Sequence, residues 1–480
     1  MAETAARKEL EDLQQDLHDV QELLRRHRLV ESLVERQASP KRALVETPAH
    51  KQHIAELHAK LDQMHAADIA YILEALPINA RLVLWNLVKA ERDGEILLEL
   101  SEPVRESLIR TMDSDELVAA VESLDTDEIA ELAPDLPDEV IQDVFQSLPV
   151  AEREQLRAAM SYPEDAVGAL MDFDVVSVRE DIGLETVTRY LRRFEELPDH
   201  TDQLFVVDRG QRLKGVLPIA RLVVTDLDRS VEAAMLTEFV TLYPDDKAQD
   251  AAQAFERYDL VSAPVVDQAG KLVGRVTVDA VVDFIRQKSE GEALALGGLR
   301  ETEDVFASVW ESVKNRWSWL AINLVTAFIA SRVIGAFEGS IGKLVALAAL
   351  MPIVAGIGGN SGNQTITMIV RAHALGQIQL GQARKLFAKE IGVALVNGLV
   401  WGGMLGLLAY ALYANFKLGL VMMLAMTLNL MLAAVMGVVI PLTMTRLGRD
   451  PAIGSSVMIT ACTDSGGFFI FLGLATLILL

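Results

Sequence analysis

The stretch LGLVMMLAMTLNLMLAAVMGVVIPLTMT, residues 418–445, carries no charge between Lys417 and Arg446. A bilayer core about 30 Å thick needs about 20 apolar residues in a helix that rises about 1.5 Å per residue. The stretch is longer than that and predicts a membrane-spanning helix. Applied from Trp317 to the C-terminus, the same criterion predicts five spans: 317–337, 344–370, 391–416, 418–445 and 452–480.

The part of the chain before Trp317 has the opposite character. Of the 68 acidic and 44 basic residues, only four acidic and nine basic ones lie from Trp317 onward, so the first 316 residues carry a net charge of −29 and the rest +5. An acidic surface of this kind excludes a nucleic-acid partner, because phosphate binding needs clustered Lys and Arg. The composition predicts an acidic soluble part followed by a membrane domain.

Cysteine use and loop charges predict where each part lies. The single cysteine, Cys462, excludes an intramolecular disulfide and favours a reduced, cytoplasmic soluble part. The charged first 30 residues lack the apolar segment of a signal peptide. Basic residues mark two loops as cytoplasmic, which places the N-terminus inside and the C-terminus outside a cytoplasmic membrane. These are Arg371, Arg384, Lys385 and Lys389 in one loop, and Arg446 and Arg449 in the other.

One carboxylate falls near the middle of the last predicted span. Asp464 stands in ITACTDSGGFF, residues 459–469, with no basic residue within a helical turn. A charge at mid-bilayer costs several kcal/mol unless it faces a partner or a water-filled cavity. A protonated Asp464 in a structural hydrogen bond between helices is one interpretation. We favour an ionised Asp464 that lines a cation path, since its own helix offers no base to neutralise it.

The second predicted span contains a polar segment, GIGGNSGNQ at 356–364. Its glycines predict a poorly continuous helix. Small residues let membrane helices approach closely, which is the structural interpretation. Backbone carbonyls freed in such a segment would instead have to face water or protein. With Asp464, the oxygens of this segment would suit Mg²⁺ or Ca²⁺ rather than a thiolate-seeking metal.

The acidic part contains an internal repeat. FVVDRGQRLKGVL at 205–217 and APVVDQAGKLVGRV at 263–276 place Asp208 and Asp267, and likewise Gly215 and Gly274, at one constant offset. Each predicts a strand, a turn, a second strand and a helix, as expected of a duplicated α/β unit. The pattern resembles a tandem pair of CBS modules. Such pairs usually bind adenosine-bearing ligands or ions and regulate an attached protein.

The residues before the repeat predict helices. Short apolar segments with N-cap signals at Asp113, Asp125 and Asp138 predict a small helical solenoid over about 54–159. Upstream, apolar residues three and four apart predict a short amphipathic or coiled helix, with a charged surface helix as the alternative. These residues are Leu10, Leu13, Leu17, Val20 and Leu24.

The order of these parts resembles a known family. An acidic helical domain, tandem CBS modules and five spans, with MPIVAGIGGNSGNQ at 351–364 and RLGRDPAIGSSVMITACTDSGG at 446–467, closely resemble the MgtE family of magnesium channels. The resemblance covers about 54–480, and its membrane motifs are the specific part. It implies a multidomain fold: a superhelical α-helical N-terminal domain, an α/β tandem CBS pair, a connecting helix and an all-α, five-helix transmembrane domain.

The resemblance implies the following domain boundaries: 1–50 a charged amphipathic extension, 51–160 the helical domain, 161–226 and 227–286 the CBS modules, 287–315 the connecting helix and 316–480 the transmembrane domain. It also implies a homodimer in the lipid bilayer, with a pore on the two-fold axis and largely hydrated Mg²⁺ held by Asp464. Paired carboxylates suit an ion that dehydrates reluctantly. The other pore residues implied are Asp450 at the cytoplasmic entrance, Thr460 through its main-chain carbonyl, and Gly359, Asn360 and Asn363 of the second span.

The family also implies gating by intracellular Mg²⁺, which bridges acidic faces and holds the pore shut until the ion is lost. Candidate regulatory ligands are Asp115, Asp259, Asp283, Glu290 and Glu292. The chain departs from the family pattern at Ala280, Lys288, Gly291 and Ser456. Fewer acidic ligands predict that closure needs more Mg²⁺ or another signal, such as ATP or another adenine nucleotide at the CBS pair.

Three other functions fit the sequence less well. A coupled cation antiporter would need a second, proton- or sodium-linked site, for which a lone Asp464 is weak support. An intramembrane metalloprotease would need an H-E-x-x-H pair, which the sequence lacks. A sensor that transports nothing would leave Asp464 and the polar second span without a role. An Mg²⁺ channel without enzymatic activity is therefore the favoured function.

Overall fold

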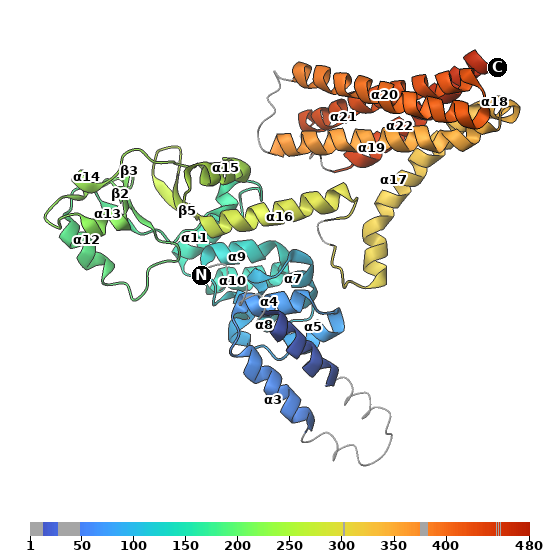
Figure 1. Ribbon diagram of the computed structural model, residues 1–480. Helices are drawn as coiled ribbons and strands as arrows, with labels where there is room; N and C mark the ends of the chain where they lie inside the picture. The colour runs from blue at the N-terminus through green and yellow to red at the C-terminus, as the bar shows by residue number, and fades with distance from the viewer. Residues whose placement is uncertain are drawn as a thin grey trace, which may run out of the picture. The chain divides into compact units, whose positions relative to one another are not determined.

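The computed structural model describes residues 13–26, 49–300, 303–374, 383–447, 449, 451 and 453–480. The chain divides into two compact units (Figure 1). The first comprises Met1–Arg286 with Asp304–Ala307, and the second comprises Gln287–Glu303 with Ser308–Leu480. Each unit is described by itself below.

The first half of the first unit is helical, as predicted. Its main core is made of Leu, Ile and Val side chains such as Leu57, Ile69 and Leu97. Asp113 and Asp125 cap their helices in capping boxes with Glu116 and Glu128. The elements are α3 (Ala49–Leu61), α4 (Ala66–Glu74), α5 (Ile78–Trp85), η1 (Ala90–Arg92), α6 (Asp93–Glu99), α7 (Glu102–Ile109), α8 (Ser114–Val121), α9 (Thr126–Leu132), η2 (Ala133–Asp135), α10 (Asp138–Ser147) and α11 (Val150–Ala159).

Residues 13–26 form the amphipathic helix predicted upstream of this domain. Val20 and Leu24 are buried in the same core as Leu57 and Leu61 of α3. Lys60 of α3 pairs with two carboxylates of the helix, Asp16 at 2.9 Å and Asp19 at 2.7 Å. This segment is therefore part of the helical domain, and the alternative of a solvated surface helix is wrong.

Asp93 is a buried acid in the helical domain, and it makes the domain's stability depend on pH. Gly94 brings α6 so close to α8 that a Cβ there would lie 2.3 Å from the Ala120 carbonyl oxygen. Asp93 is consequently 9% exposed, and its Oδ1 has no hydrogen-bond partner among the described residues. Burial, helped by the negative charge of Glu116, raises the pKa of Asp93 from its usual 3.8 to about 6.

We expect Asp93→Asn to stabilise the helical domain above pH 6 and to leave it unchanged below pH 4. The raised pKa means that the folded state resists ionisation of Asp93. The stability of the wild type therefore falls by about 2–3 kcal/mol as the pH rises from about 4 to 6, and it is constant above pH 6. Thermal unfolding of the full chain in detergent at pH 4.5 and pH 8 measures this difference. An equal change at both pH values would contradict it.

The second half of the first unit contains the predicted α/β repeat. β2 pairs in parallel with β1 and antiparallel with β3, and β4 pairs antiparallel with β5. Val206 opposite Gly215 repeats as Val265 opposite Gly274, each followed by a bulge. The elements are η3 (Val167–Leu170), β1 (Ser177–Arg179), α12 (Leu184–Leu191), β2 (Gln203–Val207), β3 (Leu213–Pro218), α13 (Ile219–Val224), α14 (Val231–Ala234), α15 (Ala248–Tyr258), β4 (Ser262–Val266) and β5 (Leu272–Thr277).

The predicted connecting helix at 287–315 differs from the structure. α16 (Val278–Leu296) starts directly after β5 and ends well before residue 315. Gly298, with φ 76°, follows in the left-handed region that favours glycine. The next helix begins only at Val309, where Ser308 and Glu311 form a capping box. The residues between the two helices are therefore not helical where the structure describes them.

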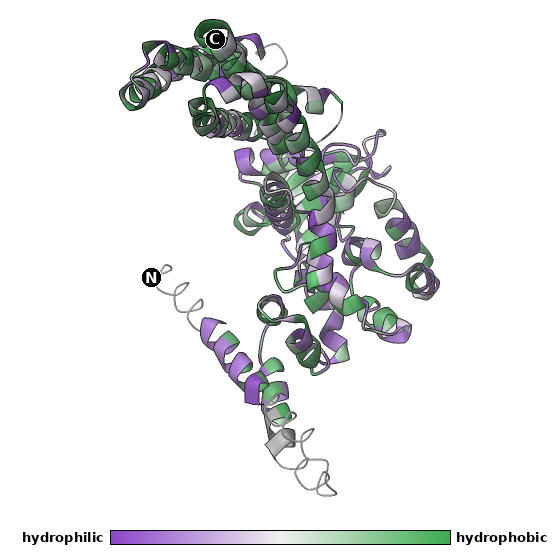
Figure 2. Ribbon diagram, turned by 90° about the vertical axis from the view of Figure 1, so that its right-hand side faces the viewer, coloured by the Kyte–Doolittle hydropathy of each residue, from purple (hydrophilic) through white to green (hydrophobic). Residues whose placement is uncertain are grey.

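The second unit contains five helices of 25 residues or more among its described residues. Figure 2 shows them as largely hydrophobic, in contrast to the polar helix at the N-terminus. Their core centres on α21, whose side chains Val421, Met422 and Ala425 are fully buried. The helices are α17 (Val309–Ala336), α18 (Glu338–Lys343), α19 (Ala346–Ala374), α20 (Ala383–Tyr413), α21 (Phe416–Arg446) and α22 (Ser455–Leu479).

Four of these helices, α17, α20, α21 and α22, are long and apolar enough to cross a membrane. α19 matches the second predicted span, but its segment 356–364 makes it more polar than the other four. The expectation that this segment interrupts the helix is wrong, since α19 is continuous from Ala346 to Ala374. Even Pro352 is accommodated, and α19 offers its glycines as a packing surface.

Candidate functional site

Glycines let α19 approach α21 and α22 closely. A Cβ built at Gly362 would lie 2.4 Å from Ile459 Cγ1 of α22. A Cβ built at Gly437 of α21 would lie 2.9 Å from the Thr365 side chain of α19. Small residues permit this kind of contact between membrane helices. The three helices therefore form one tightly packed group, and the packing interpretation of the glycine segment is correct.

Asp464 lies on α22 within this group. Its side chain is half-buried and forms no hydrogen bond or ion pair with any described residue. The neighbouring Thr460 and Thr463 donate their hydroxyl hydrogens to carbonyl oxygens of their own helix, those of Ser456 and Ile459, at 2.9 Å each. The structure thus leaves the Asp464 carboxylate without a protein partner inside an apolar helix. The interhelical hydrogen bond of the alternative interpretation of Asp464 is absent from the part of the chain described here.

One predicted residue of α19, Gly359, packs against the turn of α22 that carries Asp464. A Cβ at Gly359 would lie 3.7 Å from Thr463 Oγ1, one residue before Asp464. Asn360 is exposed and Asn363 is half-buried. Gln364, one turn beyond Asn360, is also exposed and extends the same polar face. α19 therefore carries a polar face of amide side chains, and α22 carries a carboxylate in the turn that Gly359 contacts.

The remaining predicted pore residue, Asp450, lies outside the described residues. Within the described ranges, no three Asp, Glu, His or Cys side chains are grouped closely enough to hold a metal ion directly. In the part of the chain that the structure describes, the oxygen ligands are therefore isolated and form no closed metal cage. Such an arrangement suits a cation that keeps most of its water.

Two polar residues behind this surface were not predicted. Asn429 of α21 is completely buried and donates from Nδ2 to the Val354 carbonyl oxygen of α19, at 2.9 Å. Glu390 of α20 is 7% exposed and accepts a hydrogen bond from Thr365 Oγ1 at 3.3 Å. Both are polar residues within or beside apolar stretches, and this feature of the sequence could have identified them. Asn429 is not ionisable, and Glu390 lies just outside the predicted third span, 391–416.

The C-terminal end of α16 packs within the second unit. Ala295 shares a small core with Ile366, Val370, Ile440 and Ile459. Just beyond, the backbone at Gly298 approaches the Trp319 indole of α17, where a Cβ would lie 2.0 Å from Trp319 Cε2. The segment between the CBS pair and the first membrane helix therefore packs on α19, α21 and α22, next to Thr460 on α22.

The first unit brings acids of three segments together. We call them the acid cluster: Asp125, Asp127, Glu128 and Glu131 around α9, Asp172, Asp174 and Asp199 of the CBS pair, and Asp283 of α16. Burial, then the negative charge of Asp172, raises the pKa of Asp127 from 3.8 to about 7. Burial likewise raises the pKa of Glu131, against the attraction of Arg105. The cluster is therefore a place where like charges oppose packing between the helical domain and the CBS pair.

Only one of the predicted regulatory residues belongs to the acid cluster. Asp283 lies near Glu131 and also pairs with Arg286, at 3.5 Å. Asp115 is exposed in the first turn of α8, and Asp259 is the exposed C-cap of α15. Glu290 and Glu292 lie on the part of α16 that belongs to the second unit. Asp115 and Asp259 therefore lie outside the acid cluster.

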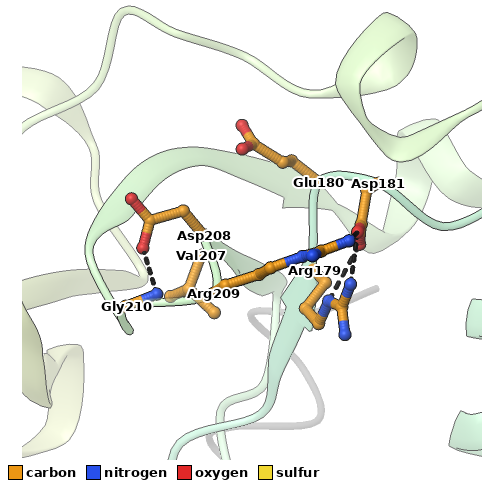
Figure 3. Close-up of a pocket in the computed structure, with 7 residues that line it drawn as sticks. All are labelled: Arg179, Glu180, Asp181, Val207, Asp208, Arg209 and Gly210. Atoms are coloured by element: carbon orange, nitrogen blue, oxygen red, sulfur yellow. Dashed lines mark hydrogen bonds and ion pairs between the residues drawn. The ribbon is translucent and has the colours of Figure 1, made fainter.

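A shallow pocket lies on the first CBS module, at the ends of β1 and β2 (Figure 3). Arg179 and Arg209 both point at Asp181 and donate hydrogen bonds to it. The hydrogen bond from Arg179 is the main reason that the pKa of Asp181 is lowered. Because both guanidinium groups are already engaged by a carboxylate, the pocket is a weak candidate for binding a phosphate.

Comparison with known proteins agrees with this architecture. A family model described as a divalent cation transporter matches residues 351–474, one described as the MgtE intracellular N domain matches 64–165, and a CBS domain model matches 229–287. The magnesium transporter MgtE of Thermus thermophilus is 31% identical over 432 residues, which cover 88% of this chain and 95% of the relative. The chain belongs to the MgtE family.

A second MgtE relative, the magnesium transporter of Bacillus subtilis, is 26% identical over 425 residues, covering 88% of this chain and 94% of the relative. A crystal structure of the cytosolic domain of the Mg²⁺ channel MgtE in complex with ATP matches with 30% identity and a TM-score of 0.44, covering 51% of this chain and 98% of that one. MgtE proteins are membrane transporters with an intracellular N domain, not enzymes, and this chain shares their order of domains.

Proposed function

We propose that the chain is a Mg²⁺ channel that conducts the ion inward across the cytoplasmic membrane through a pore lined by α19 and α22. The observation that carries the proposal is Asp464, a carboxylate without a protein partner among the described residues of an apolar helix. The amides of Asn360 and Asn363 lie on the adjacent helix. Isolated oxygen atoms can bind hydrated Mg²⁺ through the water molecules that the ion keeps.

The pore forms between two copies of the chain. Asn360 and Gln364 are exposed on one face of α19, in the middle of a helix that is long enough to span a bilayer. Polar amides do not face lipid, because hydrocarbon offers them no hydrogen bonds. A two-fold partner would cover this face and would bring two Asp464 carboxylates to one axis. With the N-terminal part inside the cell and five spans, the C-terminus would lie outside.

We expect Asn360→Cys to form a crosslinked dimer in membranes when the only native cysteine is removed by Cys462→Ser. Asn360 is exposed on α19 and would line the two-fold axis. Treatment with a short bis-maleimide and gel electrophoresis measures the product. Leu407→Cys on α20, 71% exposed on an apolar face, is the matched control and should remain monomeric. Equal crosslinking at both positions would argue against a dimer through α19.

Intracellular Mg²⁺ closes the channel through the acid cluster. The donor set fits the ion, because it consists of hard carboxylate oxygens. Burial, then the negative charge of Asp172, raises the pKa of Asp127 among them to about 7. Because no three described carboxylates are grouped for direct ligation, hydrated Mg²⁺ would bridge them through water. Bound Mg²⁺ would hold the helical domain on the CBS pair, and its loss would release them.

The test of transport is Mg²⁺ uptake into liposomes that contain the purified protein. A membrane potential, negative inside, is imposed without a proton or sodium gradient. Uptake driven by the potential alone supports the channel. Uptake that appears only with a counter-ion gradient would replace it with the antiporter, and no uptake under either condition, at low internal Mg²⁺, would leave the sensor.

A nucleotide at the CBS pair is a separate proposal, based on the resemblance of the repeat to CBS modules. ATP or another adenine nucleotide bound there would strengthen closure and lower the Mg²⁺ concentration that closes the channel. The liposome assay with and without ATP on the cytoplasmic side measures this. An unchanged Mg²⁺ dependence would remove the nucleotide from the proposal.

A further inference from the structure

The side chain of Asn429 lies where α19, α21 and α22 meet. Its amide nitrogen donates to the Val354 carbonyl oxygen of α19. A Cβ built at Gly358 of α19 would lie 2.2 Å from the same nitrogen, and one at Gly467 of α22 would lie 2.7 Å from it. The amide therefore occupies the space that side chains at both glycines would need.

The two glycines adjoin the proposed pore residues. Gly358 precedes Gly359 and Asn360, and Gly467 is one helical turn beyond Asp464. Asn429 thus touches both proposed pore-lining helices close to their proposed ligands. Its Oδ1 is buried and has no hydrogen-bond partner among the described residues. The amide is therefore held by one hydrogen bond and by close packing against the two glycines.

We propose that Asn429 is a positioning residue that sets the spacing and register of α19 and α22, and thereby the ion selectivity of the pore. This inference rests on the proposed function. Selection between Mg²⁺ and the larger Ca²⁺ depends on how far apart the oxygen ligands stand. A spacer that is wedged between two glycines fixes that separation in a way that apolar packing alone does not.

Reciprocal substitution tests the wedge. Asn429→Ala empties the space and Gly467→Ala overfills it, so each alone should lower the ratio of Mg²⁺ to Ca²⁺ uptake in liposomes about tenfold. The double variant restores a small side chain in that space and should recover the ratio to within about threefold of wild type. Additive loss in the double variant would overturn the proposal.

Two controls separate this role from simple destabilisation. Thr427→Val alters a buried residue of the same helix whose hydroxyl bonds only within α21, to the Met423 carbonyl oxygen, and should leave the ratio unchanged. Gel filtration in detergent shows whether each variant is folded. A wild-type protein without any Mg²⁺ uptake would defeat the proposed function, whereas uptake with a ratio insensitive to Asn429→Ala would defeat only this inference.

A second, independent observation concerns a buried ion pair in the first unit. Arg81 of α5 is completely buried, and its guanidinium donates to the Leu73 carbonyl oxygen at 3.0 Å and to Asp304 Oδ2 at 2.9 Å. Asp304 is 12% exposed and also accepts a hydrogen bond from the Phe306 backbone N–H. Residues 304–307 therefore belong to the first unit, although the residues on both sides of them belong to the second unit.

We infer that this ion pair is a latch that connects the helical domain directly to the first membrane helix. The latched segment ends one residue before Ser308, the N-cap of α17. A buried guanidinium that loses its carboxylate is destabilising. Residues 304–307 are therefore either fully bound to the helical domain at Arg81 or fully released from it. Movement of the helical domain would then reach α17 through the chain itself, in parallel with the CBS pair.

Asp304→Asn tests the latch in two measurements. In the Cys462→Ser background, maleimide labelling of Phe306→Cys should become about tenfold faster when Asp304→Asn releases the segment. In liposomes, the cytoplasmic Mg²⁺ concentration that halves uptake should rise at least about threefold, while uptake at low Mg²⁺ stays unchanged.

The neighbouring Glu303→Gln is the matched control. Glu303 bonds to Asn315 and Arg316 rather than to the helical domain, and its loss should not speed labelling. Faster labelling of the Asp304→Asn variant with an unchanged Mg²⁺ response would show that the segment is released without regulating the pore, and would overturn the inference. Unchanged labelling would overturn it as well. A channel that lacks Mg²⁺ closure even as wild type would instead defeat the proposed gating.

Discussion

Mg²⁺ uptake should fall at least about 100-fold when Asp464 is replaced by Ala, because the only carboxylate that the described residues place within α22 is then lost. Mg²⁺ uptake by the Asp464→Asn variant should fall nearly as far, because an amide keeps an oxygen ligand but not the negative charge. The measurement is potential-driven uptake into liposomes that contain equal amounts of folded protein.

The neighbouring Ser465→Ala is the control for this experiment. Ser465 is half-buried on the same helix, one residue further on, and its hydroxyl is not among the proposed ligands. It should retain uptake within about twofold of wild type, because no charge is removed. Full uptake by Asp464→Asn would show that the carboxylate is not ionised in the conducting state. It would favour the structural interpretation of this residue.

Asp127→Asn should make the packing of the helical domain on the CBS pair largely independent of Mg²⁺. In the wild type, burial and the charge of Asp172 raise the pKa of Asp127 to about 7, so its ionisation at neutral pH opposes packing. The Asn variant removes that charge and one of the proposed Mg²⁺ ligands together. Protease protection of the cytoplasmic part, titrated with Mg²⁺, measures the effect. Protection without Mg²⁺ should rise, and its increase on adding Mg²⁺ should shrink.

The same charge predicts a pH dependence with a definite sign. The packed state holds the Asp127 proton more tightly than the separated state, so packing is favoured below pH 4, weakens as the pH rises toward 7 and is level above. Wild-type protection without Mg²⁺ should therefore be greater at pH 5.5 than at pH 8, whereas the Asp127→Asn variant should differ much less. Asp115→Asn, at an exposed position outside the acid cluster, should behave as wild type. Equal pH dependence in both variants would contradict the assignment to Asp127.

The elements that sequence patterns predicted well are those whose signal is local. An uncharged apolar run predicts a membrane helix because hydrocarbon excludes charge, and α21 matches 418–445 closely. The repeat at 205–217 and 263–276 predicted two strand pairs with one register, because a duplicated sequence repeats its side-chain alternation. The glycine segment of α19 misled, since helix propensity is a weak prior that packing against α21 and α22 overrides.

The sites divide along the same line. Asp464 could be singled out from the sequence because a carboxylate within an apolar run is anomalous in any fold. The acid cluster could not, because Asp127 and Asp172 are far apart in the chain, and each looks like one of many surface acids until the fold buries them together. Asn429 stands out in the sequence only as a polar residue in an apolar run. Neither its position between Gly358 and Gly467 nor the ion pair of Arg81 with Asp304 can be seen there.

Composition and local pattern thus established the membrane part, the repeat and the intramembrane carboxylate, because water and lipid sort residues by charge and periodicity alone. Which acids oppose each other, which amide separates the two proposed pore helices and which linker residue enters the helical domain depend on long-range contacts. Only tertiary packing brings such groups within hydrogen-bond distance, so only the folded chain could decide them.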